Sequence, residues 1–82
     1  MKKIENSECQ VEFGEFLKRG RTQRDMLQTE VAALAGITQA FYSQIENGIR
    51  NIDFVLALRL CQIIRIDIND FIKQYMRNKT DI

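Results

Sequence analysis

The chain has 82 residues, a formal net charge of +1, and no His, Trp or Pro. That length fits a single domain near the lower limit at which a hydrophobic core alone holds a fold, and the absence of His excludes Ser-His-Asp and Cys-His catalysis and most zinc sites. No apolar run approaches the roughly 18 residues of a membrane span, and the first residues lack the apolar region of a signal peptide, so we expect a cytoplasmic protein with no membrane partner.

The 3.6-residue spacing of apolar side chains predicts an all-α fold, because no segment alternates over the length of a strand. Residues 1–10 are polar and mixed in charge and are expected to form an N-terminal arm, whereas residues 11–82 form one domain. The expected helices cover about residues 11–24, 28–35, 38–47, 54–64 and a stretch that follows Asp67.

Apolar positions within these helices define the expected core. The first helix is expected to turn Phe13, Phe16 and Leu17 inward. The fourth helix is expected to bury six side chains, namely Phe54, Ala57, Leu58, Leu60, Cys61 and Ile64. The fifth helix is expected to face the core with Ile68, Phe71 and Ile72.

Short polar residues and glycines mark the expected helix ends. Thr38, Asp53 and Asp67 stand where an N-cap side chain accepts a hydrogen bond from the first turn. Gly36 and Gly48 lie just past helix ends, where a left-handed conformation favours glycine. The turn at Gly36 joins the second and third helices into a helix-turn-helix.

The third helix separates its side chains by chemistry. At ~100° per residue, one side gathers small or uncharged polar residues, namely Gln39, Ala40, Ser43, Gln44 and Asn47. The opposite side carries Thr38, Phe41, Tyr42 and Ile45, of which the two aromatic residues fit a core better than base stacking. Amide and hydroxyl groups can form hydrogen bonds with base edges in the major groove. The alternative is that they are ordinary solvent-facing side chains.

Four motifs match a known family, namely Gln28-Thr-Glu-Val-Ala, Ala35-Gly-Ile-Thr-Gln, Ser43-Gln-Ile-Glu-Asn-Gly and Arg50-Asn51. On these residues, the chain from Met26 to Phe71 resembles, without a gap, the lambda-repressor-like (Cro/repressor or XRE-type) helix-turn-helix family. The resemblance implies a five-helix lambda-repressor-like domain whose partner is double-stranded DNA, with its second and third helices as the helix-turn-helix.

The resemblance also implies roles for single residues. Base reading would fall to Gln39, Ala40, Ser43 and Gln44, and contacts with the DNA backbone to Gln28, Thr38, Asn47 and Arg50. Arg21 would form a structural ion pair with Glu46 and fix the first helix against the third. Because Gln can bind adenine with both ends of its amide, and Ala40 can contact a thymine methyl group, a weak preference for A·T-containing sites is expected.

Several positions depart from the family pattern. Leu27 replaces a Ser or Thr cap, so the second helix is expected to begin poorly capped, at a cost of roughly 1 kcal/mol. Asp25 and Arg65 stand where Gly commonly follows a helix, and the turn at Arg65 is expected to differ because Arg tolerates a left-handed conformation less well than Asp. Tyr42 replaces Ile or Val, which bears on the tilt of the third helix.

The charged residues and the two cysteines discriminate less well between the possible functions. Basic residues cluster ahead of the two-helix motif, at Lys18, Arg19, Arg21 and Arg24, which fits either a DNA partner or an ordinary solvated face. Cys61 is expected in the core, Cys9 has no evident role, and their spacing provides no metal site. Since no glycine-rich phosphate loop is present either, we expect no enzyme and no cofactor, and no small-molecule ligand is evident.

A single recognition helix contacts too few base pairs to single out an operator, and this family uses a two-fold dimer on a pseudo-palindrome. Ile66, Tyr75 and Met76 are expected to remain as apolar surface and to form the dimer interface, unless Tyr75 and Met76 fold back on the first helix. Half-sites would lie roughly 34 Å apart.

The expected function is that of a transcriptional regulator that binds a specific operator as a homodimer. It would serve as a phage or mobile-element repressor, a restriction-modification controller or a host regulator. Its regulation would come from its own concentration or from a protein partner. The alternative is a protein-binding anti-repressor or antitoxin module that uses the same fold.

Overall fold

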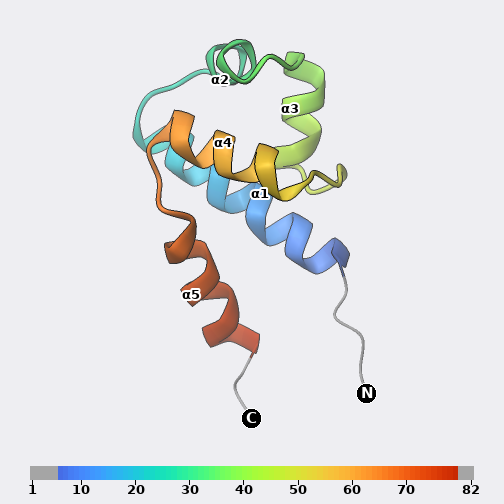
Figure 1. Ribbon diagram of the computed structural model, residues 1–82, viewed down its shortest axis with the longest axis vertical. Coiled ribbons are helices and arrows are strands. Elements are labelled where there is room, and N and C mark those ends of the chain that lie inside the picture. Colours follow the sequence, from blue (N-terminus) through green and yellow to red (C-terminus); the bar gives the residue numbers. More distant parts are fainter. Residues whose placement is uncertain (1–5, 80–82) are drawn as a thin grey trace.

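The computed structural model describes residues 6–79. Within this range the chain forms five helices and no strand, namely α1 (Asn6–Gln23), α2 (Gln28–Ala35), α3 (Gln39–Glu46), α4 (Phe54–Ile64) and α5 (Ile68–Lys79) (Figure 1). The expected all-α class and helix order are confirmed. No helix in the described part of the chain is long and apolar enough to cross a membrane.

The first helix begins earlier than its sequence suggested. α1 starts at Asn6, so the second half of the expected polar arm is helical, and residues 1–5 lie outside the described residues. Cys9 packs against the core one helical turn before Phe13, and Glu8 in the first turn has a charge that the N-terminal helix dipole favours. A polar stretch therefore becomes helical because one of its faces is docked.

Side chains define both ends of the helix-turn-helix. Leu27 has no acceptor to cap α2, but the Glu30 carboxylate accepts a hydrogen bond from the Leu27 N–H at 2.7 Å, which provides the reciprocal half of a capping box. The expected weak start of α2 is therefore partly compensated. Thr38 Oγ1 caps α3 by accepting from the Phe41 N–H at 3.0 Å, and Gly36 between the helices is left-handed with φ 72°.

One hydrophobic core joins the helices. Its most deeply buried large side chains are Tyr42, Leu17, Leu60, Ile64 and Val31. α3 packs against α1 and α2, α4 packs against the same two helices, and α5 packs against α1. Aromatic rings join α1 to α5, since the ring centres of Phe13 and Phe71 lie 5.2 Å apart.

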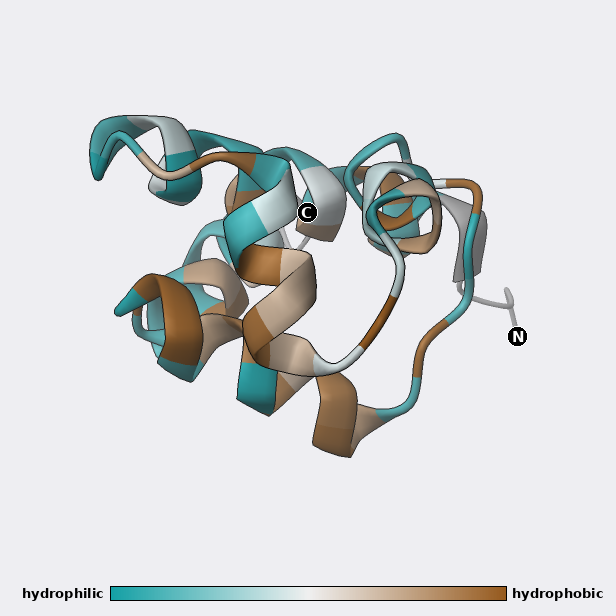
Figure 2. Ribbon diagram, turned by 90° about the horizontal axis from the view of Figure 1, so that it is seen from above, coloured by the Kyte–Doolittle hydropathy of each residue, from teal (hydrophilic) through white to brown (hydrophobic). Residues whose placement is uncertain are grey.

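The expected core of α4 is only partly right. Leu60, Cys61 and Ile64 are buried, but Phe54 is 67% exposed and Leu58 38% exposed. These two lie one turn apart at the edge of the buried stripe, on a helix that is the most hydrophobic of the five and largely brown in Figure 2. In α5, Ile72 is also outside the core at 47% exposed, whereas Phe71 is buried.

Two non-glycine residues accept the left-handed conformation at helix ends. Asp25 has φ 54° and Arg65 has φ 67°. The expected change of turn at Arg65 is therefore wrong, because Arg65 N–H still bonds to the end of α4 and its carbonyl accepts from Arg24 at 2.6 Å. The turn directs Ile66 back onto α1, where its methyl group would lie 2.7 Å from a Cβ added at Gly20.

The crossing of α1 over α3 is unusually close. A Cβ added at Gly14 would lie 2.5 Å from the carbonyl oxygens of both Ile45 and Glu46. These are backbone atoms, so only a glycine lets α1 reach the end of α3 at this distance. The close approach fixes the position of α3 relative to the rest of the molecule.

Candidate nucleic-acid interface

The small and uncharged polar residues of α3 lie on its outward-facing side. Gln39 and Ala40 in its first turn are exposed, Ser43 and Gln44 in the next turn are half-buried, and Asn47 is exposed at the C-cap. Tyr42, Ile45 and Glu46 occupy the buried side. The two faces separate as the sequence indicated, except that the charged Glu46 belongs to the interior.

Glu46 is held in the interior by an ion pair with α1. Arg21 Nε donates to Glu46 Oε2 at 2.6 Å, and its second terminal nitrogen donates to Oε1 at 3.1 Å. The Arg21 side chain is 11% exposed and the Glu46 side chain 2% exposed. A third donor group of Arg21 reaches the Met26 carbonyl at 2.8 Å, so the same side chain also holds the turn between α1 and α2.

The environment of Glu46 keeps it ionised. Burial alone would raise the pKa of this carboxyl group, but the hydrogen bonds from Arg21 and Gln28 outweigh burial and hold the pKa below its ordinary value. The same contact with Glu46 raises the pKa of Arg21. Both partners are therefore charged across the physiological range.

A chain of amide contacts leads from this ion pair to the surface. Gln28 Nε2 donates to Glu46 Oε1 at 2.9 Å, and Gln28 Oε1 accepts from Gln39 Nε2 at 3.2 Å. No local sequence pattern predicts the contacts of Gln28, because they depend on how α2 and α3 are placed. They leave Gln39 with its carbonyl oxygen and one N–H for an outside partner.

Arg50 lies beyond α3, in the loop that leads to α4. It is exposed, and its guanidinium carbon lies 4.8 Å from the ring centre of Phe41. This cation–π contact restrains the side chain and leaves the charge in solvent. Phe41 is partly buried against the core, which agrees with its expected core role.

The basic residues in and directly after α1 do not form one cluster. Lys18 and Arg19 are exposed, Arg21 is used internally, and Arg24 bonds to the Arg65 carbonyl at the end of α4. The polar face of α3 therefore offers hydrogen-bonding groups and shape, with little positive charge of its own.

The three residues expected at a dimer interface differ in exposure. Ile66 and Tyr75 are partly buried and pack against the core, and Tyr75 stacks on Phe71 with ring centres 5.7 Å apart. Met76 is 50% exposed. The apolar surface at Ile66 is smaller than expected, because this side chain packs against Gly20 of α1.

Comparisons with known proteins agree with this geometry. A family model described as helix-turn-helix matches residues 17–71. Among solved structures, the chain is similar to the restriction-modification controller protein C.AhdI from Aeromonas hydrophila, at 26% sequence identity and a TM-score of 0.75, covering 83% of this chain and 99% of that one. No curated protein matches the sequence.

Proposed function

The chain belongs to the helix-turn-helix family of DNA-binding regulators, and we propose that it controls transcription by binding a specific duplex operator as a homodimer. Of the settings considered, the similarity to C.AhdI favours a restriction-modification controller over a phage repressor or a host regulator. We propose no catalytic activity, no cofactor and a cytoplasmic location.

The observation that carries this proposal is the connection between the α3 surface and the interior. Gln39 is bound to Gln28, and Gln28 to the buried Glu46. A side chain whose rotamer is held in advance loses less entropy when it binds a base. Burying the Glu46 carboxylate costs desolvation free energy. The arrangement therefore serves to hold the outward-facing amide of Gln39 more directly than to stabilise the fold.

The residues divide into two roles on the DNA. Gln39, Ala40, Ser43 and Gln44 would face base edges, where each good bidentate pair discriminates by ~1–3 kcal/mol. Four others would contact the DNA backbone, namely Gln28, Thr38, Asn47 and Arg50. Gln28 would use its remaining N–H near the N terminus of α2, where the helix dipole favours a phosphate.

The dimer interface is best sought at the exposed apolar residues of α4 and α5. These are Phe54, Val55, Leu58, Ile72 and Met76, each at least 38% exposed. Phe54 and Ile72 line one cavity, so the two helices contribute to a continuous surface. Met76 keeps its expected role in this proposal, whereas Ile66 and Tyr75 are partly buried against the core and lie beside α1.

The proposal is tested by selecting bound sequences from a random duplex library and then comparing variants on the selected site. Gln39→Ala and Gln44→Ala should each weaken specific binding by ~1–3 kcal/mol and relax the preference at one or two base pairs, with little change on random DNA. Gln62→Ala, at an exposed glutamine of α4, is the matched control. Failure to select any sequence would favour the alternative of a protein-binding anti-repressor or antitoxin module.

Arg50→Ala separates positioning from base reading. It should weaken specific and random DNA alike and reduce the salt dependence by about one unit. An unchanged salt slope would place Arg50 away from the duplex.

Assembly has its own test. Val55→Glu combined with Met76→Glu places charge at two side chains that are at least 50% exposed, so we expect the protein to remain folded, sediment as a monomer and lose operator affinity. A parent protein that is monomeric both free and on the operator would reject the dimer.

A further inference from the structure

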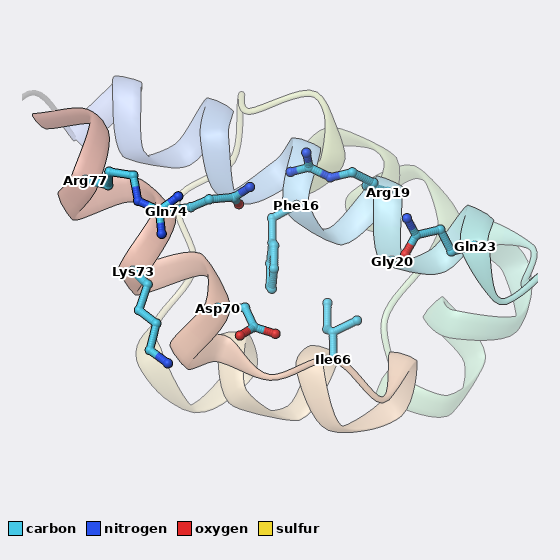
Figure 3. A pocket seen from close by; sticks show the side chains of 9 residues that line it. All are labelled: Phe16, Arg19, Gly20, Gln23, Ile66, Asp70, Lys73, Gln74 and Arg77. Atoms are coloured by element: carbon cyan, nitrogen blue, oxygen red, sulfur yellow. The ribbon is translucent and has the colours of Figure 1, made fainter.

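A concave surface lies between α1 and α5, on the side of α1 that faces away from α3. α1 turns Gly14 and Arg21 towards α3. At ~100° per residue, Arg19 and Gln23 each lie roughly 160° around the helix from Arg21. They line a cavity of about 390 Å³ together with residues of α5 (Figure 3).

The cavity combines an apolar floor with a polar rim. Phe16 of α1 and Ile66 of the connecting turn project into it, and Ile66 packs directly against Gly20 (Figure 3). The rim consists of Arg19 and Gln23 from α1, and Asp70, Lys73, Gln74 and Arg77 from α5. Both amides can donate and accept hydrogen bonds.

The rim carries unpaired positive charge. Arg19, Lys73 and Arg77 are exposed, and none of them forms a salt bridge with another residue of the range 6–79. Asp70 is the one acid that lines the cavity. Three cations against one carboxylate leave this surface attractive to an anion, although the protein as a whole has a formal charge of only +1.

We propose that this cavity binds a small organic anion, in which a phosphate or carboxylate group is attached to an apolar or aromatic body. The arginines suit the charged group because a guanidinium pairs with such oxygens through two hydrogen bonds. The floor of Phe16 and Ile66 suits the body, and the volume falls within the ~300–1,000 Å³ of small-molecule pockets.

The surroundings favour a small ligand over a macromolecule. Duplex DNA on α3 would lie on the other side of α1. An extended acidic protein segment would meet Glu12 and Glu15, which line a smaller neighbouring cavity with Arg19. These two carboxylates border the positive rim next to Arg19, so a compact anion fits the cavity best.

The test uses amide NMR spectra of the full chain titrated with AMP, inorganic phosphate and adenosine. AMP combines the charge and the aromatic body, and the other two probes supply one part each. We expect AMP to shift amides of residues 16–23 and 66–77 saturably, and to bind about tenfold more tightly than either phosphate or adenosine, because both parts of the site then contribute.

Variants assign the binding to this cavity. Arg19→Gln with Arg77→Gln should weaken AMP at least about tenfold, and Asp70→Asn should strengthen it about threefold because a repulsive charge is removed. Lys18→Gln, which removes a neighbouring exposed cation outside the cavity, should change nothing. All four positions are exposed, so the variants should fold, and retained spectral dispersion would confirm it.

Three results would overturn the proposal: no saturable shift with AMP, equal binding by the double variant, or equal affinity for adenosine and AMP. Shifts at residues 66–77 produced by a random DNA duplex, with none from AMP, would instead make this surface a second DNA contact. These outcomes do not depend on operator binding, so they are distinct from a failure of the proposed regulatory function.

Discussion

At the end of the molecule where α1, α2 and α3 meet, Glu46 accepts hydrogen bonds from Arg21 and Gln28, and Gln28 accepts one from Gln39. At the other end, α4 and α5 leave large apolar side chains such as Phe54 and Ile72 in solvent, and cavities open on both sides of α5. We call the first end the completed end, because its ion pair and its amide hydrogen bonds have their partners within one chain. This end is suited to present a fixed surface. The second end keeps exposed apolar side chains and open cavities, and it is where we expect partners and ligands to bind.

The largest expected effect comes from breaking the ion pair at the completed end. Glu46→Gln keeps the side-chain size but leaves the Arg21 guanidinium buried without an anion. We expect the free energy of unfolding at pH 7 to fall by about 3 kcal/mol, measured by urea unfolding, whereas Glu15→Gln on the exposed face of α1 should have little effect.

The same pair predicts a pH dependence. The pKa of Glu46 in the folded protein lies below its ordinary value of 4.5. The stabilisation is therefore fully present above pH 4.5 and is lost as the pH falls through the lowered pKa. The difference between the parent protein and Glu46→Gln should shrink in acid, and a difference that stays constant down to pH 3 would contradict this account.

The close approach of α1 to α3 gives the next largest effect. Gly14→Ala places a Cβ against two backbone carbonyls that cannot move independently of α3. We expect a loss of about 2–3 kcal/mol and a fall in operator affinity, since α3 must shift. Gly36→Ala is the matched control because it meets no atom within 4 Å and should cost only about 1 kcal/mol for its left-handed φ. Equal losses in both variants would argue against a tight crossing.

These effects separate what could be predicted from sequence from what could not. The bounds of α2 and α4, and the caps Thr38 and Asp53, follow from local patterns and are confirmed. The start of α1 does not follow, because Cys9 stabilises that turn only through contact with distant residues. Likewise, the pattern of α4 cannot distinguish a side chain that is buried in the core from one such as Phe54 that stays exposed.

The candidate site divides in the same way. The polar face of α3 follows from helical spacing, and the family resemblance suggested that Arg21 and Glu46 pair. The link from Glu46 through Gln28 to Gln39 depends on the angle and distance between helices, which no local pattern contains. Its role on DNA stays a prediction.

In the turn between α4 and α5, Arg65 offers a gain in stability. It holds a left-handed φ of 67° at the end of α4, and Arg65→Gly should raise the free energy of unfolding by about 1 kcal/mol because glycine has no Cβ penalty there. The carbonyl that accepts from Arg24 is unchanged. Arg59→Gly, an exposed arginine within α4, should instead lose about 1 kcal/mol. The midpoint temperatures of thermal unfolding of the two variants should therefore shift in opposite directions. A loss of stability in both variants would show that the turn depends on the Arg65 side chain.

The smallest expected effect concerns a buried hydroxyl group at the completed end. The Tyr42 hydroxyl is buried beside Glu46 and Arg21, and it has no hydrogen bond of acceptable geometry. Burial, with the nearby Glu46 carboxylate, raises the pKa of this phenol, so it stays protonated at physiological pH.

An unsatisfied buried hydroxyl costs stability, so Tyr42→Phe should raise the free energy of unfolding by up to about 1 kcal/mol. The gain is limited because the removed oxygen leaves a small void. Urea unfolding of Tyr42→Phe beside Tyr75→Phe, whose ring is only partly buried, measures the difference. A loss of 1 kcal/mol or more in Tyr42→Phe alone would show that the hydroxyl donates to Glu46 in solution. Tyr42 would then be a third donor that holds the carboxylate beneath the α3 surface.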